Sequence, residues 1–357
     1  MAKIKVAVLF GGASSEHDIS LKSATHIIKN IPREKYDVVC IGITRKGRWL
    51  YYPGDVDQIA TGNWEHDPDC TSAVLSPDPL HKGFLVIDNG KVSAKKIDVV
   101  FPVLHGKNGE DGTVQGLLEL AKIPYVGCGL LASAACMDKA AAHTILEYHG
   151  IHMAKWEQIF RRDMKHLEEK CIAIAEKLGG YPLFIKPANA GSSIGISRAE
   201  NQAQLVDGVK KAFIHDDKVI VEECIVGREL ETAVFGYDAP FASTVGEIEA
   251  CNTFYDFDAK YVSSGSKLSI PANLSDEKKQ EIKEIAVKAY MAIGCCGLSR
   301  VDFFMKEDGE VILNEINTMP GFTSISMYPK LMGYMGMTQP YLVDKIIEQA
   351  IATERTC

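Results

Sequence analysis

The sequence has no long run of lysine or arginine, and its formal net charge is −8. These features argue against non-specific nucleic-acid binding, although a local basic cleft stays possible. The sequence also has no uncharged apolar run near the roughly 20 residues that span a bilayer. Its first residues, MAKIKVAVLFGG, are too short and too soon interrupted by glycines for a signal peptide. We therefore expect neither a nucleic acid nor a membrane as a partner.

Cysteines spaced for metal or redox chemistry are also missing. The ten cysteines form no C-x-x-C pair and lie mostly in apolar segments, so we expect reduced thiols in a cytoplasmic protein. The composition, 46% hydrophobic and 24% charged, is ordinary for a globular protein. A chain of 357 residues is longer than one core usually spans, so two or three domains are expected.

Strand and helix patterns alternate in the first third of the chain. Apolar runs in KVAVLF, YDVVCIGIT and IDVVFPVLHG predict strands, and SLKSATHIIKNI and TVQGLLELAKI have helical periodicity. This order predicts a parallel sheet covered on both faces, with a further strand at PYVGC and an end near residue 130. Residues 52–97 contain clusters of Pro, Gly and Asp, and we expect a long loop or small hairpins there.

The rest of the chain predicts two further lobes of mixed helix and strand. A strand, turn and strand are expected in PLFIKPANAGSSIGISRA, and the segments after residue 228 are richer in strands. Helices are predicted at 163–178, 201–213 and 276–292, and in the last segment PYLVDKIIEQAIA. The expected domains are 1–130, 131–222 and 223–357.

An Asp-Gly pair at 308–309 separates two alternating apolar runs in VDFFMKEDGEVILNEIN and predicts a hairpin. With a two-residue turn, Asp302 faces Glu315. Arg300 then faces Asn317, and strand alternation puts both pairs on one face. Opposed carboxylates, with Cβ atoms about 5 Å apart, destabilise a hairpin unless a cation binds them. Two carboxylates and an amide suit Mg²⁺ or Mn²⁺. The alternative is a solvated face neutralised by the arginine, and a three-residue loop would break this register.

A loop rich in glycine and serine follows a strand in FIKPANAGSSIGIS. It is not a P-loop, because no Gly-Lys-Ser/Thr stands before a helix. Its backbone N–H groups and hydroxyls at 191–195 could still cradle phosphates, with Lys186 and Lys139 adding positive charge. The alternative is an ordinary flexible hairpin. A metal site and a phosphate loop in one chain support each other.

Two more loops follow strands of the predicted parallel sheet. FGGASSEHDIS lacks the G-x-G-x-x-G spacing of dinucleotide folds, and its Glu16 could equally be a helix cap. HGKNGEDGT contains three glycines, and its charges, with His105, could simply be solvated. In open parallel sheets, however, ligands bind beyond the carboxyl ends of the strands, where both loops lie.

Six motifs occur in order along nearly the whole chain: FGGASSEHDIS, HGKNGEDGT, CMDK, KPANAGSSIG, SRVDFF and NEINTMPGFTSISMYP. Together they resemble the D-alanine–D-alanine ligase family of the ATP-grasp superfamily, and only residues 52–97 lack a recognisable signature. The resemblance implies an α/β protein with an ATP-grasp fold and an N-terminal, Rossmann-like domain built on a parallel sheet. It also implies that ATP lies between the central and C-terminal lobes, with the D-alanine substrates facing the N-terminal lobe.

The resemblance further implies which residues bind ATP and metal. Lys139 and Lys186 would contact the phosphates. The other ATP contacts would come from Ser193 in the glycine loop, from Glu222, Glu223 and Ile225 at the adenine, and from Glu229 at the ribose. Two Mg²⁺ or Mn²⁺ ions would be held by Asp302, Glu315 and Asn317.

The implied reaction transfers the γ-phosphoryl group of ATP to the carboxylate of one D-alanine, and the amine of a second then attacks the acyl phosphate. Arg300 and the Gly321 backbone N–H would stabilise the tetrahedral oxyanion. Glu16 would pair with the ammonium of the first D-alanine, and His105 would lie nearby. The product would serve peptidoglycan synthesis, and with it cell-wall biogenesis and cell shape.

Residues from two loops would close this site and exclude water. By resemblance, Ser192 and Tyr261 would link to Glu16 through hydrogen bonds, and the loop 252–267 would act as the lid. Lys260 and Tyr261 match the pattern of relatives that use D-alanine, although some D-serine ligases share this pair.

The acceptor is expected to be D-alanine. Ser326 and the Gly321 turn would hold its carboxylate, and Met327 would offer an apolar contact to its methyl group. Relatives that make D-Ala-D-Ser or the D-lactate ester commonly carry an arginine after the equivalent serine, and this chain does not. The alternatives are a D-serine or D-lactate ligase of the same family, another ATP-grasp enzyme, or a non-catalytic nucleotide-binding subunit. A homodimer is a family-level expectation.

Overall fold

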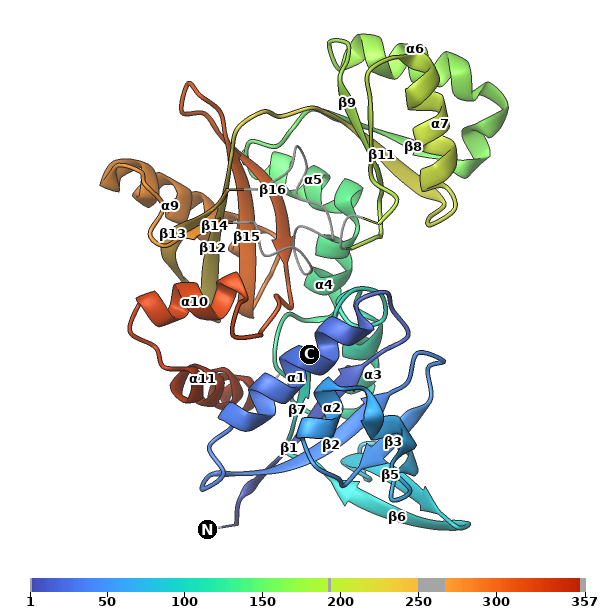
Figure 1. Cartoon of the computed structure of the whole chain (residues 1–357), viewed down its shortest axis with the longest axis vertical. Coiled ribbons are helices and arrows are strands. Elements are labelled where there is room, and N and C mark those ends of the chain that lie inside the picture. The colour runs from blue at the N-terminus through green and yellow to red at the C-terminus, as the bar shows by residue number, and fades with distance from the viewer. Residues whose placement is uncertain (1, 192–193, 250–266, 354–357) are drawn as a thin grey trace.

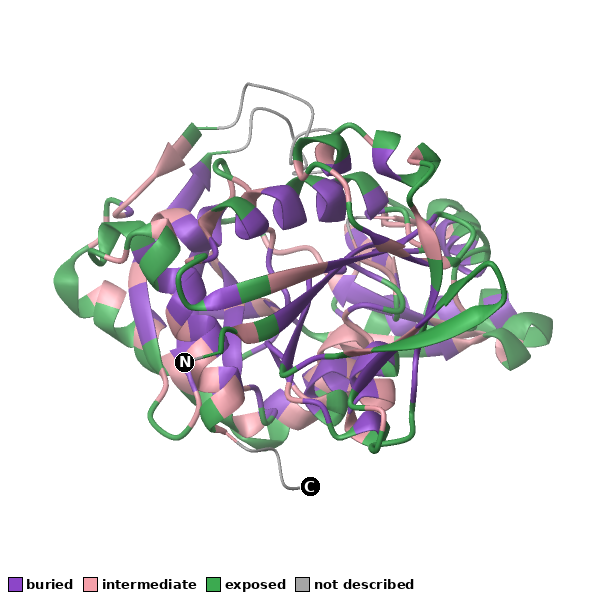
Figure 2. Ribbon diagram, turned by 90° about the horizontal axis from the view of Figure 1, so that it is seen from below, coloured by how far each residue is buried: buried purple, intermediate pink, exposed green. Residues whose placement is uncertain are grey.

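The computed structural model describes residues 2–191, 194–249 and 267–353, which form three sheets (Figure 1). The sheet of the N-terminal lobe lies at one end of the molecule, and the sheet of the central lobe lies at the other. Helices carry buried residues on one side and exposed residues on the other (Figure 2). No helix among the described residues is long and apolar enough to cross a membrane.

The N-terminal lobe is built on a seven-stranded sheet with the order β6-β5-β4-β3-β2-β1-β7. Its elements are β1 (Ile4–Gly11), α1 (His17–Asn30), β2 (Tyr36–Ile43), β3 (Trp49–Tyr52), α2 (Asp57–Ala60), the 3₁₀ turn η1 (Asn63–His66), β4 (Thr71–Leu75), β5 (Gly83–Asp88), β6 (Lys91–Lys96), β7 (Val99–Pro102) and α3 (Thr113–Ala121). Strand β1 is buried on both faces, because Val8 packs in the core with α1 and Leu9 in the core with α3. The predicted two-sided cover is confirmed.

The prediction of an all-parallel sheet is only partly right. Strand β1 pairs in parallel with β2 and β7, but β3 to β6 extend the sheet in antiparallel order. Of the two expectations for residues 52–97, small hairpins are therefore confirmed and a long loop is wrong. The sequence signal is the Asn89–Gly90 pair, whose positive φ angles of 47° and 79° are those of a two-residue hairpin turn. The predicted strand at PYVGC is reduced to a single parallel bridge between Val100 and Tyr125.

The central lobe holds a four-stranded sheet with the order β10-β9-β11-β8. Its elements are β8 (Trp156–Phe160), the 3₁₀ segment η2 (Arg161–His166), α6 (Leu167–Lys177), β9 (Leu183–Pro187), β10 (Ser197–Ala199), α7 (Gln202–Ala212) and β11 (Lys218–Glu223). The predicted strand, turn and strand are confirmed as the antiparallel pair β9 and β10. The helix predicted at 163–178 begins later, because the chain first makes a 3₁₀ turn in which Asp163 accepts the Phe160 N–H at 2.9 Å.

The C-terminal lobe has a five-stranded antiparallel sheet with the order β14-β13-β12-β15-β16. Its elements are β12 (Arg228–Gly236), β13 (Phe241–Glu249), β14 (Lys267–Ser269), α9 (Asp276–Ala292), β15 (Gly297–Met305), β16 (Val311–Asn317), α10 (Met327–Tyr334) and α11 (Gln339–Ala352). The prediction of a helix at 276–292 is confirmed by α9, whose cap, Ser275, accepts the Lys278 N–H at 3.2 Å.

Two cores connect this sheet to the rest of the molecule. One face packs against α9 and against α4 (Leu130–Met137) and α5 (Lys139–Tyr148), with Leu146 and Leu230 in a shared cluster. On the other side, α10 and α11 join a cluster that contains Phe10 of β1. The chain thus returns to its first strand, and the C-terminal sheet is held against the N-terminal lobe. The proposed domain limits at 130 and 222 remain predictions.

Candidate active site

The hairpin of β15 and β16 has the predicted register at the carboxylate pair. Asp302 pairs with Glu315, and Arg300 pairs with Asn317. Arg300 donates to both oxygens of Asp302 at 2.7 Å, and the Asn317 amide donates to Oδ2 of Asp302 at 3.0 Å. Asp302 is buried. The four predicted residues of this face are therefore brought together.

The predicted two-residue turn of this hairpin is wrong. Residues 306–310 join the strands, and near the turn the register is one residue off, with Phe303 opposite Leu313. The register shifts back between Phe303 and Asp302, so that Asn314 is the extra residue of a bulge. The longer turn and the bulge offset each other, which is why the predicted pairing at Asp302 is nevertheless correct.

Glu231 of β12 adds a third carboxylate that the sequence analysis missed. It pairs with Asp302 across the strands, and its Oε2 lies 2.9 Å from Nε of Arg300. Glu231 is 6% exposed. The signal in the sequence was the spacing of Glu229 and Glu231, which places both on the same face of one strand.

The central lobe presents a second charged cluster, built on β9, β11 and α5. Glu222 lies between Nζ of Lys186, at 2.5 Å, and Nε2 of His143, at 3.1 Å. Burial alone would raise the pKa of Glu222, but the Lys186 charge and the His143 hydrogen bond lower this pKa to about 2. His143 was not predicted, although it follows Lys139 by four residues and therefore shares its helix face.

The glycine loop after β9 is held at its start by α5 and by the segment before β11. The backbone N–H of Lys139 donates to Ala188 at 3.0 Å, and its Nζ donates to the Ala190 carbonyl at 2.7 Å. The Asn189 N–H donates to Asp216 at 2.7 Å. Lys139 therefore contacts the loop, as expected, and its contact with phosphates remains a prediction.

Glu16 lies where the N-terminal lobe meets this loop. A methyl group added to Gly191 would lie 2.9 Å from Glu16 Oε2, and one added to Gly106 would lie 2.2 Å from the same atom. Glu16 is buried, so its carboxylate is enclosed by two glycine loops rather than by solvent. The two loops predicted at the carboxyl ends of the parallel strands therefore meet the glycine loop of the central lobe.

Glu110, which was not predicted as a site residue, links the same region to the C-terminal lobe. It accepts the Gly106 N–H at 2.7 Å and the Met319 N–H at 3.1 Å. Removal from water raises the pKa of Glu110 to about 8, and the charge of Glu16 and, more weakly, that of Glu315 add to the shift. Three carboxylates thus converge from two lobes.

His105 is buried in a hydrogen-bonded chain between the lobes. Its Nδ1 lies 3.0 Å from the Met319 carbonyl and its Nε2 lies 3.1 Å from the Ser23 hydroxyl. A carbonyl can only accept, so Nδ1 carries the proton and Nε2 accepts from Ser23. The Phe322 N–H in turn donates to Ser23 at 3.2 Å. Burial lowers the pKa of His105 to about 4, so the ring is neutral and supports the 319–322 turn.

The predicted acceptor residues lie at the start of α10. Ser326 accepts the Thr323 N–H at 3.0 Å, and its Oγ would be 3.1 Å from a methyl group added to Gly321. Met327 is buried, and its sulfur would lie 3.0 Å from a methyl group added to Gly246 of β13. Ser326 and Gly321 are therefore neighbours, while Met327 packs in the core beneath them.

Three of the predicted ATP-binding residues lie on or between β11 and β12. Glu223 accepts the Lys155 N–H at 2.9 Å, Ile225 is half-buried between β11 and β12, and Glu229 pairs with Phe304 of β15. The remaining predictions, Ser192, Ser193, Lys260 and Tyr261, with nearly all of the expected lid at 252–267, lie outside the described residues.

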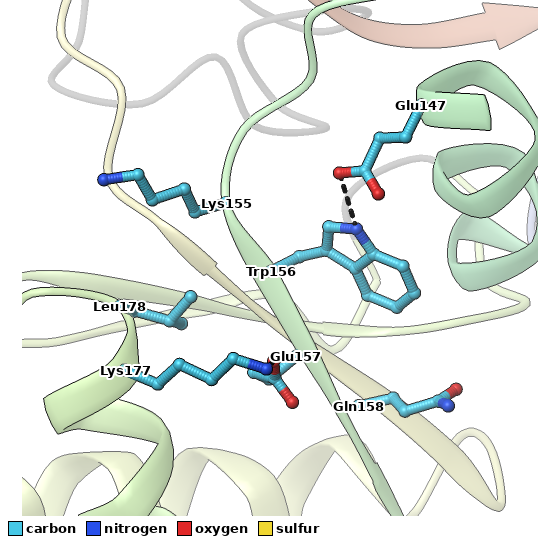
Figure 3. A pocket seen from close by; sticks show the side chains of 7 residues that line it. All are labelled: Glu147, Lys155, Trp156, Glu157, Gln158, Lys177 and Leu178. Atoms are coloured by element: carbon cyan, nitrogen blue, oxygen red, sulfur yellow. Dashed lines mark hydrogen bonds and ion pairs between the residues drawn. The ribbon is translucent and has the colours of Figure 1, made fainter. Parts of the chain in front are cut away.

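A hollow of about 420 Å³ lies along β8, the strand whose Trp156 pairs with Glu222 (Figure 3). The Trp156 indole donates to Glu147 at 3.1 Å on one side, and Lys177 pairs with Glu157 on the other. The indole also contacts the His143 ring, with centroids 5.2 Å apart. The polar groups on the wall of the hollow are thus largely paired with one another.

The C-terminal lobe presents a carboxylate hairpin, and the central lobe presents a glycine loop held by a lysine. Two such lobes, each built on an antiparallel sheet, define the ATP-grasp class of enzymes. The family described as D-ala D-ala ligase N-terminus matches residues 5–128, and the one described as D-ala D-ala ligase C-terminus matches residues 145–348. The chain belongs to the D-alanine–D-alanine ligase family, and the predicted family and fold are confirmed.

Similar proteins cover nearly the whole chain. The D-alanine–D-alanine ligase of Acetivibrio thermocellus is 50% identical over 98% of this chain and 96% of its own, and that of Caldicellulosiruptor bescii is 47% identical over 99% and 97%. Among solved structures, the VanG D-Ala:D-Ser ligase of Enterococcus faecalis has a TM-score of 0.90 at 44% identity, covering 98% of this chain and 100% of that one. The D-alanine–D-alanine ligase of Coxiella burnetii has a TM-score of 0.86 at 33% identity, covering 99% and 96%.

Proposed function

We propose that this protein joins two molecules of D-alanine to D-alanyl-D-alanine with ATP, through a D-alanyl phosphate, and so supplies peptidoglycan precursors. The observation that carries the proposal is the meeting of three elements from three lobes. Glu16 lies against the glycine loop, and Lys139 holds that loop. Glu110 interacts with Glu16 and also with Glu315, which the β15–β16 hairpin presents opposite Asp302. The names of the similar proteins support D-alanine as substrate.

The residues of the hairpin fit a hard divalent cation. Among residues 2–191, 194–249 and 267–353, no group of three or more His, Cys, Asp and Glu could hold a metal ion. The proposed site uses the Asn317 amide oxygen beside the carboxylates of Asp302 and Glu315, an oxygen-only set that suits two Mg²⁺ or Mn²⁺ ions. Such ions supply charge neutralisation for the transferring phosphoryl group.

The protein's own residues bind, orient and stabilise the reacting groups. Lys139 and Lys186 contact the ATP phosphates, and Glu16 holds the ammonium of the first D-alanine so that its carboxylate faces the phosphate. When the second amine attacks, negative charge develops on the carbonyl oxygen. The Arg300 guanidinium and the Gly321 N–H stabilise that charge. Ser192, Tyr261 and the segment 252–267 exclude water, which competes with the amine.

We propose D-alanine rather than D-serine as the acceptor. Ser326 and Gly321 hold the acceptor carboxylate, and the apolar side chain of Met327 supports a pocket without a partner for a hydroxyl. An unpartnered hydroxyl costs roughly 1–3 kcal/mol, which corresponds to tens-fold discrimination. The 44% identity to the D-Ala:D-Ser ligase VanG makes D-serine the second candidate.

A competition assay tests this proposal. The protein is supplied with ATP, Mg²⁺ and equal concentrations of D-alanine, D-serine and D-lactate near neutral pH, and the products are separated. We expect D-alanyl-D-alanine to dominate by tens-fold. Predominant D-Ala-D-Ser or depsipeptide would overturn the acceptor, and ATP hydrolysis that ignores D-alanine would overturn the ligase. Unchanged acceptor choice in Met327→Arg would show that Met327 does not set the selectivity.

We further propose a cytoplasmic homodimer that forms through α3 and α4. Leu120, Leu130 and Leu131 are 66%, 46% and 75% exposed on these two neighbouring helices, an apolar surface that a partner could cover. Light scattering of Leu131→Glu should then give the monomer mass, whereas Leu80→Glu, on a separate exposed leucine, should keep the dimer. Equal masses for both variants and the wild type would refute this surface.

A further inference from the structure

Arg300 lies between two carboxylates from neighbouring strands. Its Nε and Nη2 donate to Asp302 at 2.7 Å, and its Nε also lies 2.9 Å from Oε2 of Glu231. The side chains of Arg300 and Glu231 are 16% and 8% exposed, so the contact is shielded from water. Shielding strengthens the attraction and makes a lost partner costly.

The geometry creates a competition at Asp302. Nε of an arginine carries one hydrogen, and here it is directed to Asp302, although Glu231 lies at nearly the same distance. Asp302 also accepts from Asn317 at 3.0 Å. Nη2 of Arg300 and the Asn317 amide both occupy Oδ2, and Nε occupies one of the two lone pairs of Oδ1. A cation that binds Asp302 through Oδ2, or through both oxygens, must therefore displace part of Arg300's hold.

We propose that Glu231 is a positioning residue that takes over Arg300 when Asp302 binds metal. The Nε–H turns from Asp302 to Glu231 by a small movement, because both acceptors are already within contact distance. The guanidinium stays charged, compensated and beside the reacting carbonyl, while the Asp302 oxygens become available. This inference rests on the proposed function, in which Asp302 is a metal ligand and Arg300 stabilises the oxyanion.

Glu231→Gln tests the proposal by metal binding. Gln keeps the size of the side chain but removes the charge, so Arg300 stays on Asp302 and opposes the cation. Electron paramagnetic resonance measures the binding of Mn²⁺ to the full chain in the presence of a non-hydrolysable ATP analogue. This binding should weaken by about tenfold, a free-energy difference of about 1.4 kcal/mol.

The double variant Glu231→Gln/Arg300→Met separates positioning from other roles. Without Arg300 nothing opposes the cation, so Mn²⁺ binding should return to the wild-type level. Unchanged binding in Glu231→Gln would overturn the proposal. Weakened binding that the second substitution does not restore would also overturn it, because Glu231 would then bind the metal itself or support the fold.

Glu247→Gln is the matched control. Glu247 is also buried and accepts two hydrogen bonds from Arg228, both at 2.6 Å, but it faces the other side of this sheet, opposite Leu230. The Glu247→Gln variant should have lower thermal stability and unchanged Mn²⁺ binding. A tenfold loss of Mn²⁺ affinity in this control would overturn the inference. If wild-type protein with the analogue bound Mn²⁺ no better than Glu315→Gln, the proposed metal site would fail, and the inference with it.

Discussion

The charged clusters of the central and C-terminal lobes differ in their balance of charge. In the central lobe one carboxylate, Glu222, lies between Lys186 and His143. In the C-terminal lobe one cation, Arg300, lies between Asp302 and Glu231. The first cluster balances its carboxylate with a lysine, whereas the second has one carboxylate more than its arginine neutralises and so favours incoming cations. In the function proposed above, the first cluster meets the ATP phosphates and the second meets the divalent ions.

The largest effect is expected at Glu315, a proposed metal ligand beside the acidic cluster. Glu315→Gln keeps the volume and one oxygen but removes a charge, and we expect kcat to fall by about a hundredfold or more, several kcal/mol of lost charge stabilisation. Steady-state rates at saturating Mg²⁺ measure this. If the opposed carboxylates were only a solvated face, the variant would keep its rate and melt at a higher temperature.

A smaller effect is expected in the basic cluster. Lys186→Met should raise the KM for ATP by about tenfold, as expected for one lost charge contact near phosphates. It also removes the main charge that lowers the pKa of Glu222 to about 2. This stabilising effect of a lowered pKa is present above pH 4.5 and is lost as pH falls toward 2.

Acid unfolding therefore provides a second measurement on the same variant. With Lys186 removed, the pKa of Glu222 rises, and the melting temperature should begin to fall at a higher pH than in the wild type. Lys177→Met, which removes the partner of Glu157 at the edge of the same lobe, is the control and should leave this onset unchanged. Coinciding acid profiles of Lys186→Met and wild type would show that Lys186 does not hold Glu222 ionised.

The third effect is on stability rather than on rate, and it concerns Glu110, which lies between the lobes. Its folded-state pKa of about 8 exceeds the ordinary value of 4.5, so the folded state binds the proton more tightly and stability falls as pH rises between these values. Between pH 6 and 8 the unfolding free energy of metal-free protein should fall by roughly 1–2 kcal/mol from this group. Glu110→Gln should flatten that slope.

Urea unfolding in EDTA at pH 6 and pH 8 measures this slope. The amide cannot accept both the Gly106 and Met319 N–H groups, so the variant is less stable at either pH, and only the difference between the two values reports the charge. An identical slope in wild type and variant would contradict the raised pKa.

The sequence predicted those parts of the site that depend on local periodicity. The face shared by Asp302 and Glu315 follows from strand alternation. This prediction is correct although the predicted turn length was wrong, because a bulge at Asn314 offsets the error. The helix at 276–292 follows from its apolar spacing and the Ser275 cap. Contacts between distant strands were not accessible in this way. Glu231 meets Arg300 only because β12 pairs with β15, and no spacing within either segment encodes that pairing.

The bulge at Asn314 has a consequence for engineering this chain. It restores the strand register between the turn at 306–310 and the carboxylate face, so the tip of the hairpin and the site do not share one uninterrupted ladder. A peptide tag or a fluorescent reporter inserted at Asp308–Gly309 would then move the solvent-facing end of the hairpin without sliding Glu315 past Asp302. This tip is therefore a suitable attachment point for a probe that must report on the cleft while leaving its geometry intact.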